Sequence, residues 1–587
     1  MSLVISGRSV DLPSVARSMG TMSWNHTGAW RNLRPRYQDK VAPCSEACPA
    51  GEDIARIEYL VREGALEEAW RQIREENPFP GVCGRVCPHP CESACNRREF
   101  DKPVSINSIE RHLADFAWNK GLVASTITAP ASGKRVSVVG AGPAGLAAAC
   151  FLRRLGHEVD LYDAREEAGG MLRYAIPEYR LPRDVLAWEV GLVLSEGVRF
   201  HPRRRLGQDL DWEELSGFDA VFLALGAWTP SALGVDGQEL SRDGLELLEA
   251  VRRGRHPSVE GVVAVIGGGD TAIDVARTVL RLGADPVIYY RRRREDMPAL
   301  SAEVQEAAEE GIPIRTLLAP ERIEAGAEGM LRLVLAPMLS VPVEGGGRAR
   351  VIPAGVPPVK VDVTAVFTAI GAKPSSVVPN DAVESSRSEA AGFHIRRLVP
   401  GEPGAGRPPV FLGGDLVNDE RTVAMAIASG KEASIAIDAE LKGVDLEEVW
   451  SAVRVGRKGS VSMNCLAGGD RSLRRNHVVQ FEQLNTTYFR YQAREEHRRI
   501  LSAVRRVRFD EVKKPVPAAW AGREASRCFH CGLCDRCDNC HVFCPDVSVL
   551  KNLGDGSRRI DYDYCKGCGV CVAECPRSAM VLEEEPR

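Results

Sequence analysis

The sequence predicts an α/β protein with two doubly wound domains, a helical cysteine-rich domain before them and a small cysteine-rich domain after them. Two glycine-rich turns, at 140–145 and 267–272, each join an apolar strand to an amphipathic helix. Six cysteines lie between residues 44 and 95, and ten lie in the last 60 residues. A chain of 587 residues is too long for one hydrophobic core, so several domains are expected.

Composition and charge narrow the classes of protein that fit. The net charge of -4 argues against nucleic acid as the main partner. The first 20 residues carry charged side chains among few apolar ones, which is unlike a signal peptide. The longest apolar stretches, such as 220–228, are far shorter than the roughly 20 residues that span a bilayer. Cysteines clustered as in metal sites indicate a reducing compartment, so we expect a cytoplasmic protein with no membrane partner.

The first cysteine cluster lies among helical patterns, for example at 54–64 and 66–76. Six cysteines this close in a reducing compartment indicate iron–sulfur or zinc binding. Iron–sulfur is favoured by the second cluster, described below. The members of the first cluster are Cys44, Cys48, Cys83, Cys87, Cys91 and Cys95.

The first glycine-rich turn has the complete context of a dinucleotide-binding fingerprint. Gly140, Gly142 and Gly145 follow the strand RVSVV and open the helix LAAACFLRRLG. Such glycines permit a tight turn and a close approach of the backbone to a pyrophosphate, which rests on the helix N-terminus. The next strand ends at Asp163, where a carboxylate would bind a ribose hydroxyl. Pro143 and Ala144 complete the predicted loop.

The second turn, Gly267-Gly-Gly269-Asp270-Thr271-Ala272, follows the strand GVVAVI. Its next strand ends in the run 291–294, four arginines, rather than in an acid. Arginine at this place accommodates a 2′-phosphate, so Arg291 and Arg292 favour NADPH over NADH, although some of the run is expected to be solvated. One acid-bearing and one arginine-bearing domain suit FAD in the first and NADP(H), or NAD(H), in the second.

The charged segment 441–520 is weakly patterned and predicts a connector that wraps over the surface. Its basic residues, including Arg505, are expected to be solvated, with an acidic partner as the alternative.

Eight C-terminal cysteines repeat the spacing of two-cluster bacterial ferredoxins. In that arrangement three close thiolates hold one [4Fe–4S] cube, and the fourth cysteine, before a proline, binds the other cube. Cys528 and Cys531 precede the repeat and do not fit the set. We expect them to be structural, with a redox role as the alternative. The repeat consists of Cys534, Cys537, Cys540 and Cys544, then Cys565, Cys568, Cys571 and Cys575.

Several longer stretches resemble the flavin domain of the glutamate synthase small-subunit family. They include GAGPAGLAAACFLRRLGHEVDLYDAREEAGGMLRYAIPEYRLP, FDAVFLALGAW, VIGGGDTAIDVARTVLRLGA, YYRRRREDMPA and FLGGDLVNDERTVAMAIASGKEAS. The resemblance covers roughly 40–440. It implies that the Gly414-Asp415 turn contacts the ribityl and phosphate of FAD, and that a helix beginning near 421–424 aims its N-terminus at the flavin ring. Further cofactor contacts implied are Gly170, Met171, Leu172, Gly226, Thr422 and Val423.

The resemblance also implies the order of domains, with the nicotinamide domain inserted into the flavin domain. The expected segments are a helical iron–sulfur domain at 1–120, FAD segments at 134–240 and 366–440, an NAD(P)H domain at 241–365, the connector at 441–520 and a ferredoxin domain at 521–587.

This chain departs from the family in its first cysteine cluster. The family, and dihydropyrimidine dehydrogenase, hold two [4Fe–4S] clusters there and use a CxxC pair just upstream of the position of Cys44. Here that stretch reads RPRYQDKVAP. The resemblance then leaves one cluster, on Cys48, Cys87, Cys91 and Glu110, and three clusters in the chain. The alternative is a fourth cluster on the remaining N-terminal cysteines, Cys44, Cys83 and Cys95.

The C-terminal repeat narrows the resemblance further. The glutamate synthase small subunit lacks it, whereas the flavoprotein partner of dissimilatory sulfite reductase and nicotinamide subunits of 2-oxoacid:acceptor oxidoreductases carry it. We therefore expect an NAD(P)H-dependent FAD iron–sulfur oxidoreductase that exchanges electrons with such a redox partner protein, in a hetero-complex or as a homodimer. No catalytic acid, base or nucleophile is expected. The alternatives are a glutamate synthase small subunit and a non-catalytic electron-wiring subunit.

Overall fold

The computed structural model describes residues 26–123, 129–342, 349–374, 408–474, 476–554 and 556–586. It also describes the backbone of four short strands: β1 (Leu3–Ile5), β2 (Arg8–Val10), β19 (Val383–Glu384) and β20 (Ile395–Leu398). The chain forms two compact units. The larger unit comprises Lys40–Phe481 and Arg490–Cys531, and the smaller comprises Met1–Asp39, Glu482–Phe489 and Gly532–Arg587.

The larger unit begins with a layer of short helices. Helices α4 and α6 cross closely because Gly84 has no side chain: a Cβ there would stand 2.6 Å from the backbone of Arg111. Trp70 of α3 is fully buried in this layer and stacks on Trp188. The helices are α1 (Pro43–Ala47), α2 (Ile54–Arg62), α3 (Leu66–Glu76), α4 (Pro80–Val86), α5 (Pro90–Ser93) and α6 (Ile106–Asn119).

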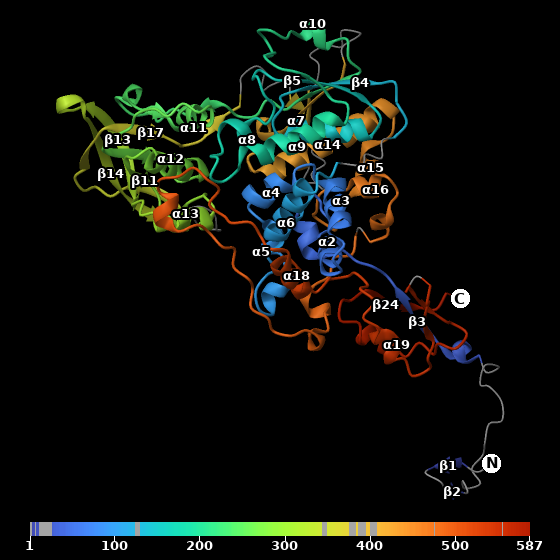
Figure 1. Cartoon of the computed structure of the whole chain (residues 1–587). Coiled ribbons are helices and arrows are strands. Elements are labelled where there is room, and N and C mark those ends of the chain that lie inside the picture. The colour runs from blue at the N-terminus through green and yellow to red at the C-terminus, as the bar shows by residue number, and fades with distance from the viewer. Residues whose placement is uncertain are drawn as a thin grey trace. The chain divides into compact units, whose positions relative to one another are not determined.

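The first sheet follows in the order β19-β20-β21-β7-β4-β5-β6. Its central strands pair in parallel and are buried along their length, as expected when helices cover both faces. Helices α7 (Pro143–Arg154), α9 (Arg183–Ser195) and α14 (Val423–Lys442) lie between this sheet and the N-terminal helices (Figure 1). The central strands are β4 (Arg135–Val139), β5 (Glu158–Tyr162), β7 (Ala220–Leu223) and β21 (Val410–Gly413), and the partly exposed β6 (Arg199–His201) forms an edge.

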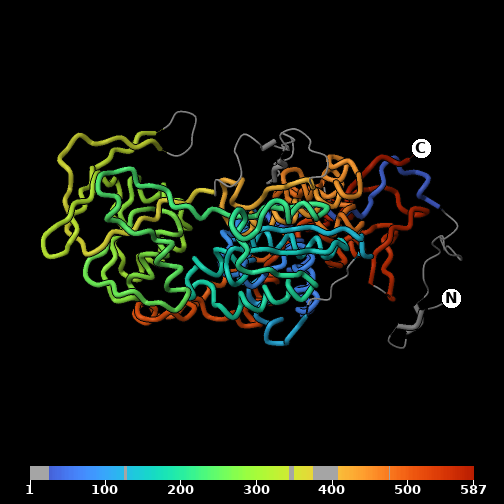
Figure 2. Tube along the Cα trace, turned by 90° about the horizontal axis from the view of Figure 1, so that it is seen from above, coloured from blue at the N-terminus to red at the C-terminus, as the bar shows by residue number. Residues whose placement is uncertain are grey.

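The second sheet has the order β12-β11-β10-β17-β9, and all its strand pairs are parallel. Helices α11 (Gly244–Arg252), α12 (Asp270–Arg281) and α13 (Ser301–Glu309) pack with it. Residues 241–370 form a lobe at one end of the larger unit, green to yellow in Figure 2. The strands are β9 (Arg242–Asp243), β10 (Val262–Ile266), β11 (Asp285–Tyr290), β12 (Ile314–Thr316) and β17 (Ala365–Thr368).

A separate antiparallel sheet completes this lobe. Strand β14 pairs with β13, β15 and β16. These strands are β13 (Leu318–Ala325), β14 (Leu331–Val341), β15 (Arg350–Pro353) and β16 (Val359–Val363).

The connector returns along the larger unit, but its basic residues are not all solvated as expected. Arg505, in α17 (Ser502–Arg505), is only 3% exposed and donates to Glu309 at 2.5 Å. Glu310 lies 3.8 Å from the same guanidinium. The carboxylates of Glu309 in α13 and of the buried Glu310 after it therefore explain why this arginine is inside. Helices α15 (Leu446–Val453), α16 (Met463–Leu466) and α18 (Ala518–Arg527) complete the segment.

The smaller unit draws residues from both ends of the chain. Strand β3 (Leu33–Tyr37) pairs antiparallel with β24 (Met580–Glu584), so part of 1–120 belongs with the C-terminal cysteines. The reason is that a module of short strands needs a further strand to cover its core. Conversely, Cys528 and Cys531, placed with the ferredoxin domain from sequence, belong to the larger unit. The other elements are α19 (Asn539–Val542), α20 (Val570–Ala573), β22 (Val549–Lys551) and β23 (Arg558–Ile560).

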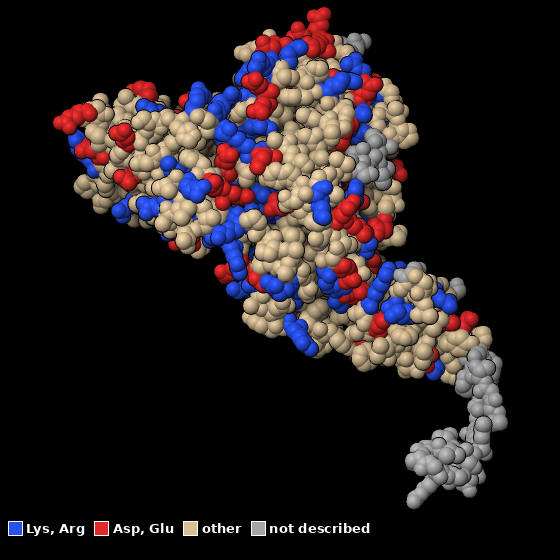
Figure 3. All heavy atoms as spheres, in the orientation of Figure 1, with Lys and Arg blue, Asp and Glu red and all other residues tan. Residues whose placement is uncertain are grey.

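Acidic and basic side chains are interspersed over the face of the larger unit seen in Figure 3. No helix within the described ranges combines the length and apolar character needed to cross a bilayer.

Candidate functional site

The turn between β4 and α7 contains three glycines, and the structural reason for glycine differs from one position to the next. At Gly140, where φ is +107°, a Cβ would stand 2.3 Å from the carbonyl oxygen of Ala224. At Gly145 it would stand 1.8 Å from the carbonyl oxygen of Gly140. Both positions are thus required by the fold itself. Gly142 differs, because the nearest atom to a Cβ there is Cα of Gly170 at 3.9 Å. Gly142 leaves open space at the helix N-terminus, which fits a pyrophosphate.

Asp163 stands at the end of β5, beside this turn. Its carboxylate accepts hydrogen bonds from the backbone N–H of Ala141 at 2.6 Å and of Arg165 at 2.7 Å. Burial raises the pKa of this carboxyl group. The side chain therefore ties the turn to the second strand, at the place where a ribose hydroxyl was expected.

Gly414, one of the predicted late contacts, lies against the same helix N-terminus. A Cβ at Gly414, where φ is +63°, would stand 2.9 Å from Cβ of Ala144. Helix α14 begins at Val423, and the hydroxyl of its N-cap, Thr422, accepts from the backbone N–H of Met425 at 3.2 Å. Burial raises the pKa of Asp415 to about 6. The structure thus brings residues from three separate stretches to one end of the first sheet.

The remaining predicted flavin contacts lie in two nearby turns. Gly170 is the N-cap of α8 (Met171–Tyr174), and a Cβ there would stand 2.7 Å from Cα of Gly142. Leu172, in this helix, is buried. Gly226, at φ +69°, lies after β7.

The second fingerprint repeats this arrangement between β10 and α12. A Cβ at Gly267 would meet the carbonyl oxygen of Ala369 at 2.3 Å, whereas at Gly269 the nearest atom is Cγ of Pro298 at 3.8 Å. Gly269 thus leaves the open position. Asp270 starts α12, and its carboxylate accepts from the backbone N–H of Leu300 at 3.1 Å. Thr271 and Ala272 follow within the first turn of the helix.

The four arginines after β11 have different environments. Arg291 is exposed, while Arg292 is half-buried and donates to the carbonyl oxygen of Ala349 at 3.2 Å. Arg293 forms an exposed ion pair with Asp296 at 3.1 Å. Arg291 is therefore the member best placed to meet a ligand beyond the strand end, while Arg293 already has a carboxylate partner.

The N-terminal cysteines line a cavity. Cys48, Cys87 and Cys91, which were predicted to share a cluster, all lie on its wall together with Glu110. Ala424, in the first turn of α14, lies on the same wall. Burial raises the pKa of these three thiols, and that of Cys48 reaches about 12. Neutral thiols crowded around a cavity fit a metal cluster, which binds them as thiolates.

Two further features of this cavity were missed from sequence. Cys83 also lines it, although the predicted ligand set left it out, and its place four residues before Cys87 on α4 was the available signal. Glu52 lines it too, and Nδ2 of Asn77 donates to both Glu52 (2.7 Å) and Glu110 (3.1 Å). Burial, and then the neighbouring charge of Glu52, raise the pKa of Glu110.

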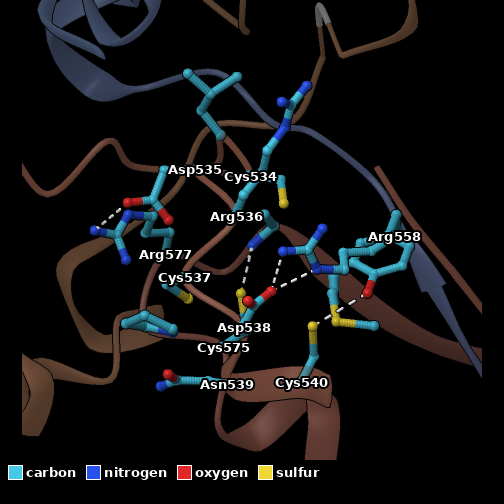
Figure 4. Close-up of a pocket in the computed structure, with 15 residues that line it drawn as sticks. Cys534, Asp535, Arg536, Cys537, Asp538, Asn539, Cys540, Arg558, Cys575 and Arg577 are labelled. Atoms are coloured by element: carbon cyan, nitrogen blue, oxygen red, sulfur yellow. Dashed lines mark hydrogen bonds and ion pairs between the residues drawn. The ribbon is translucent and has the colours of Figure 1, made fainter. Parts of the chain in front are cut away.

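The smaller unit contains a second cysteine-lined cavity (Figure 4). Its sulfurs come from three cysteines of the first run, Cys534, Cys537 and Cys540, and from the last cysteine of the second run, Cys575. This is the crossed ligand set that the repeat predicts. The phenol of Tyr37, on β3, lies 3.1 Å from Sγ of Cys540. The N-terminal strand therefore helps to enclose the cavity.

The other four cysteines of the repeat also gather. The pKa of Cys571 is raised to about 12. Burial is the largest cause, followed by the nearby sulfurs of Cys565, Cys540, Cys544 and Cys568. Among the described residues, no three His, Cys, Asp or Glu side chains converge on a point where they could share one metal ion. A cube makes no such demand, because each thiolate binds its own iron.

Comparison with known proteins agrees with this geometry. The model for dihydropyrimidine dehydrogenase domain II, a 4Fe-4S cluster domain, matches residues 34–122, and a 4Fe-4S binding domain matches 558–581. Fold and sites together define an NAD(P)H-dependent iron–sulfur flavoprotein oxidoreductase. The pyridine nucleotide-disulphide oxidoreductase model matches residues 134–430, just over half of the chain, and the chain belongs to that family. The predicted fold class is confirmed.

Three curated relatives show where the similarity lies. The chain is 35% identical to the NADP(+)-dependent formate dehydrogenase subunit beta of Moorella thermoacetica, over 68% of this chain and 60% of the relative. It is 37% identical to the NADPH-Fe(3+) oxidoreductase subunit beta of Geobacter sulfurreducens, over 59% and 53%. It is 32% identical to the glutamate synthase [NADPH] small chain of Escherichia coli, over 67% and 87%. The chain thus spans less than two thirds of the first two relatives.

Proposed function

We propose that this chain exchanges electrons between NADPH and a redox partner protein through FAD and [4Fe–4S] clusters. When bound, these groups would couple two-electron transfer at the nicotinamide to one-electron transfer at the clusters. The chain would hold FAD at the Gly142 turn and clusters in its cysteine-lined cavities. The thiol-rich sites support a reducing compartment such as the cytoplasm.

The position of Ala424 carries this proposal. Ala424 lines the cavity of Cys48, Cys87 and Cys91, and it lies directly after Thr422 and Val423, which are proposed flavin contacts. One turn of helix therefore borders both the predicted flavin site and a cluster cavity. The N-terminus of α14 also provides a positive electrostatic field, which would stabilise negative charge on a reduced flavin.

NADPH rather than NADH is supported by two observations. Arg291 is exposed at the end of β11, where the family fold places the ribose of the nicotinamide nucleotide. The names of the three relatives described above refer to NADP(+) or NADPH.

For the partner we propose a dissimilatory sulfite reductase or a 2-oxoacid:acceptor oxidoreductase, with this chain in a hetero-complex. The ferredoxin-type cavity of the smaller unit supports a protein partner that exchanges single electrons. The second candidate function of this chain is that of a glutamate synthase small subunit, which the 87% coverage of that relative favours. Purification of a tagged chain from its own cells, with identification of the co-purifying subunit, tests the partner.

The electron path can be tested separately. Wild-type protein and Cys48→Ser would be mixed anaerobically with NADPH, and flavin absorbance and cluster EPR signals would be followed in time. We expect NADPH to reduce the flavin in both proteins. The clusters should be reduced more slowly in Cys48→Ser than in the wild type. Cys465→Ser, at a buried cysteine of α16 away from the cavities, is the matched control. Unchanged cluster reduction in Cys48→Ser would contradict the path.

A further inference from the structure

Four cysteines outside the described cavities meet in the larger unit, although they lie at opposite ends of the chain. Cys44 and Cys531 are buried, and Cys95 and Cys528 are partly buried. Burial, and then the sulfurs of Cys95, Cys528 and Cys531, raise the pKa of the Cys44 thiol. The pKa of the Cys528 thiol is raised in the same way by burial, Glu58, Cys531 and Cys95. Each of these two thiols is therefore close to the other members of one group.

Specific contacts hold the C-terminal pair in this place. Nδ2 of Asn96, the residue after Cys95, donates to Sγ of Cys531 at 3.5 Å. The rings of Phe529 and Phe100 pack edge to face with centroids 5.7 Å apart. The segment 528–531 is thus anchored on the turn that carries Cys95.

The preceding residue is anchored as firmly. The guanidinium of Arg527, which is fully buried, pairs with Asp101 at 3.0 Å and donates to the carbonyl oxygen of Lys102 at 2.7 Å. Arg97 in turn donates to the carbonyl oxygen of Arg527. If the end of this helix packed loosely, Arg527 would not need a buried ion pair and buried hydrogen bonds.

The backbone around Cys528 has the geometry found at cysteines of the cluster cavities. His530 has a left-handed φ of +49°, and its N–H donates to Sγ of Cys528 at 3.3 Å. His89, at φ +57°, makes the same bond to Sγ of Cys87 at 3.5 Å. A non-glycine residue at positive φ is uncommon, so its recurrence two residues after a cysteine is informative. In the smaller unit the same turn occurs at Arg536 after Cys534 and at Gly567 after Cys565.

Glu58 supplies a second, independent observation. It is 1% exposed, and its Oε2 atom has no hydrogen-bond partner among the described residues. Its charge acts on Cys44, Cys95 and Cys528, so it lies beside the group. A buried polar atom without a partner is rare in folded proteins, and here it lies beside the four thiols.

We propose that Cys44, Cys95, Cys528 and Cys531 bind a fourth [4Fe–4S] cluster. The CxxC pair absent upstream of Cys44 is then supplied by Cys528-x2-Cys531 from the other end of the chain. This revises the sequence-based alternative, which grouped Cys44 and Cys95 with Cys83, because Cys83 lines the Cys48 cavity instead. It also revises the structural role expected for Cys528 and Cys531. The assignment is independent of the partner and of the direction of electron flow.

Metal analysis of the full-length protein, purified anaerobically, tests the proposal without any variant. We expect about sixteen irons and sixteen acid-labile sulfides per chain, four for each cube. Twelve irons would overturn it, and so would twelve irons with one zinc, which four thiolates could also bind.

Two variants then assign the ligands. Cys528→Ser and Cys44→Ser should each lower the iron by up to four per chain and remove or alter the same EPR signal, while FAD content stays at one per chain. Cys465→Ser, also buried in the larger unit, should keep the wild-type iron and spectrum. If Cys528→Ser and Cys44→Ser alter different signals, or neither alters any, the four-cysteine assignment is wrong. Should one variant fold poorly, the wild-type metal count still decides the matter.

Discussion

The buried carboxyl groups of Glu52 and Glu110 share one hydrogen-bond donor, Nδ2 of Asn77, at 2.7 Å and 3.1 Å. Both also line the cavity of Cys48, Cys87 and Cys91. The oxygen predicted as the fourth iron ligand is therefore preorganised by its neighbours. Iron at this place would meet a Glu110 side chain that the Asn77 amide already holds in position.

Replacement of Glu110 should change one cluster only. In Glu110→Ala the oxygen ligand is lost, so one EPR signal should shift or convert to that of a three-iron cluster, and the iron should fall by about one per chain. Cys83→Ser is the informative comparison, since Cys83 lines the same cavity. A silent Glu110→Ala together with an altered Cys83→Ser would show that the thiol is the ligand.

Cys575 should support the cluster of the first run rather than that of its own run. Because Cys575 shares a cavity with Cys534, Cys537 and Cys540, Cys575→Ser should remove or alter the signal that Cys537→Ser also changes. Cys544→Ser should alter the other signal. EPR of the reduced variants checks this, and a signal shared by Cys575→Ser and Cys568→Ser would refute the crossing.

A larger residue at Gly142 should exclude the flavin while sparing the fold. A Cβ at Gly142 meets nothing closer than 3.9 Å, whereas at Gly145 it meets backbone at 1.8 Å. Gly142→Val should therefore give folded protein with less than a tenth of the wild-type flavin, and Gly145→Val should fail to fold. Acid extraction and chromatography measure the flavin, which in wild type should be one FAD per chain and no FMN. Full FAD content in Gly142→Val would exclude the turn as the pyrophosphate site.

Arg291 should carry the preference for NADPH. A charge-assisted contact with phosphate contributes roughly 1.5–3 kcal/mol, so Arg291→Ala should raise the KM for NADPH about tenfold or more and leave that for NADH nearly unchanged. Arg293→Ala is the control, because Arg293 already pairs with Asp296. Better use of NADH than NADPH by wild type would contradict the assignment.

Asp415 should make stability depend on pH near neutrality. Burial raises its pKa to about 6 from 3.8, so the folded state binds a proton more tightly than the unfolded state does. The contribution of Asp415 to stability is then fully present below pH 3.8 and is lost as pH rises through about 6, by about 1 kcal/mol between pH 5 and pH 7. Asp415→Asn should lack this decline. Urea midpoints of flavin release at the two pH values measure it, and an equal decline in both proteins would rule Asp415 out.

Local patterns sufficed to predict the two fingerprints and the crossed repeat. Gly140 and Gly267 each follow a buried strand and precede a helix, so spacing and context agreed. Cys575 could be assigned across runs because the repeat itself encodes the crossing.

The missed features depend on contacts between distant segments. Nothing within Leu33–Tyr37 indicates that its partner is Met580–Glu584. Charge alone placed Arg505 on the surface, yet carboxylates of another helix and the turn after it compensate its burial. Cys528 and Cys531 showed the CxxC spacing, but only the fold brings them to Cys44. The expected domain ends stay predictions.

The larger unit ends at Cys531, and the next cysteine, Cys534, already belongs to the ferredoxin-type cavity. Three peptide units separate their Cα atoms, which therefore cannot be more than about 10–11 Å apart in any conformation. The covalent chain thus limits the distance between one ligand of the proposed fourth cluster and one ligand of its ferredoxin neighbour. An electron would then have only a short step to cross, because ligands of both proposed centres belong to the four residues 531–534.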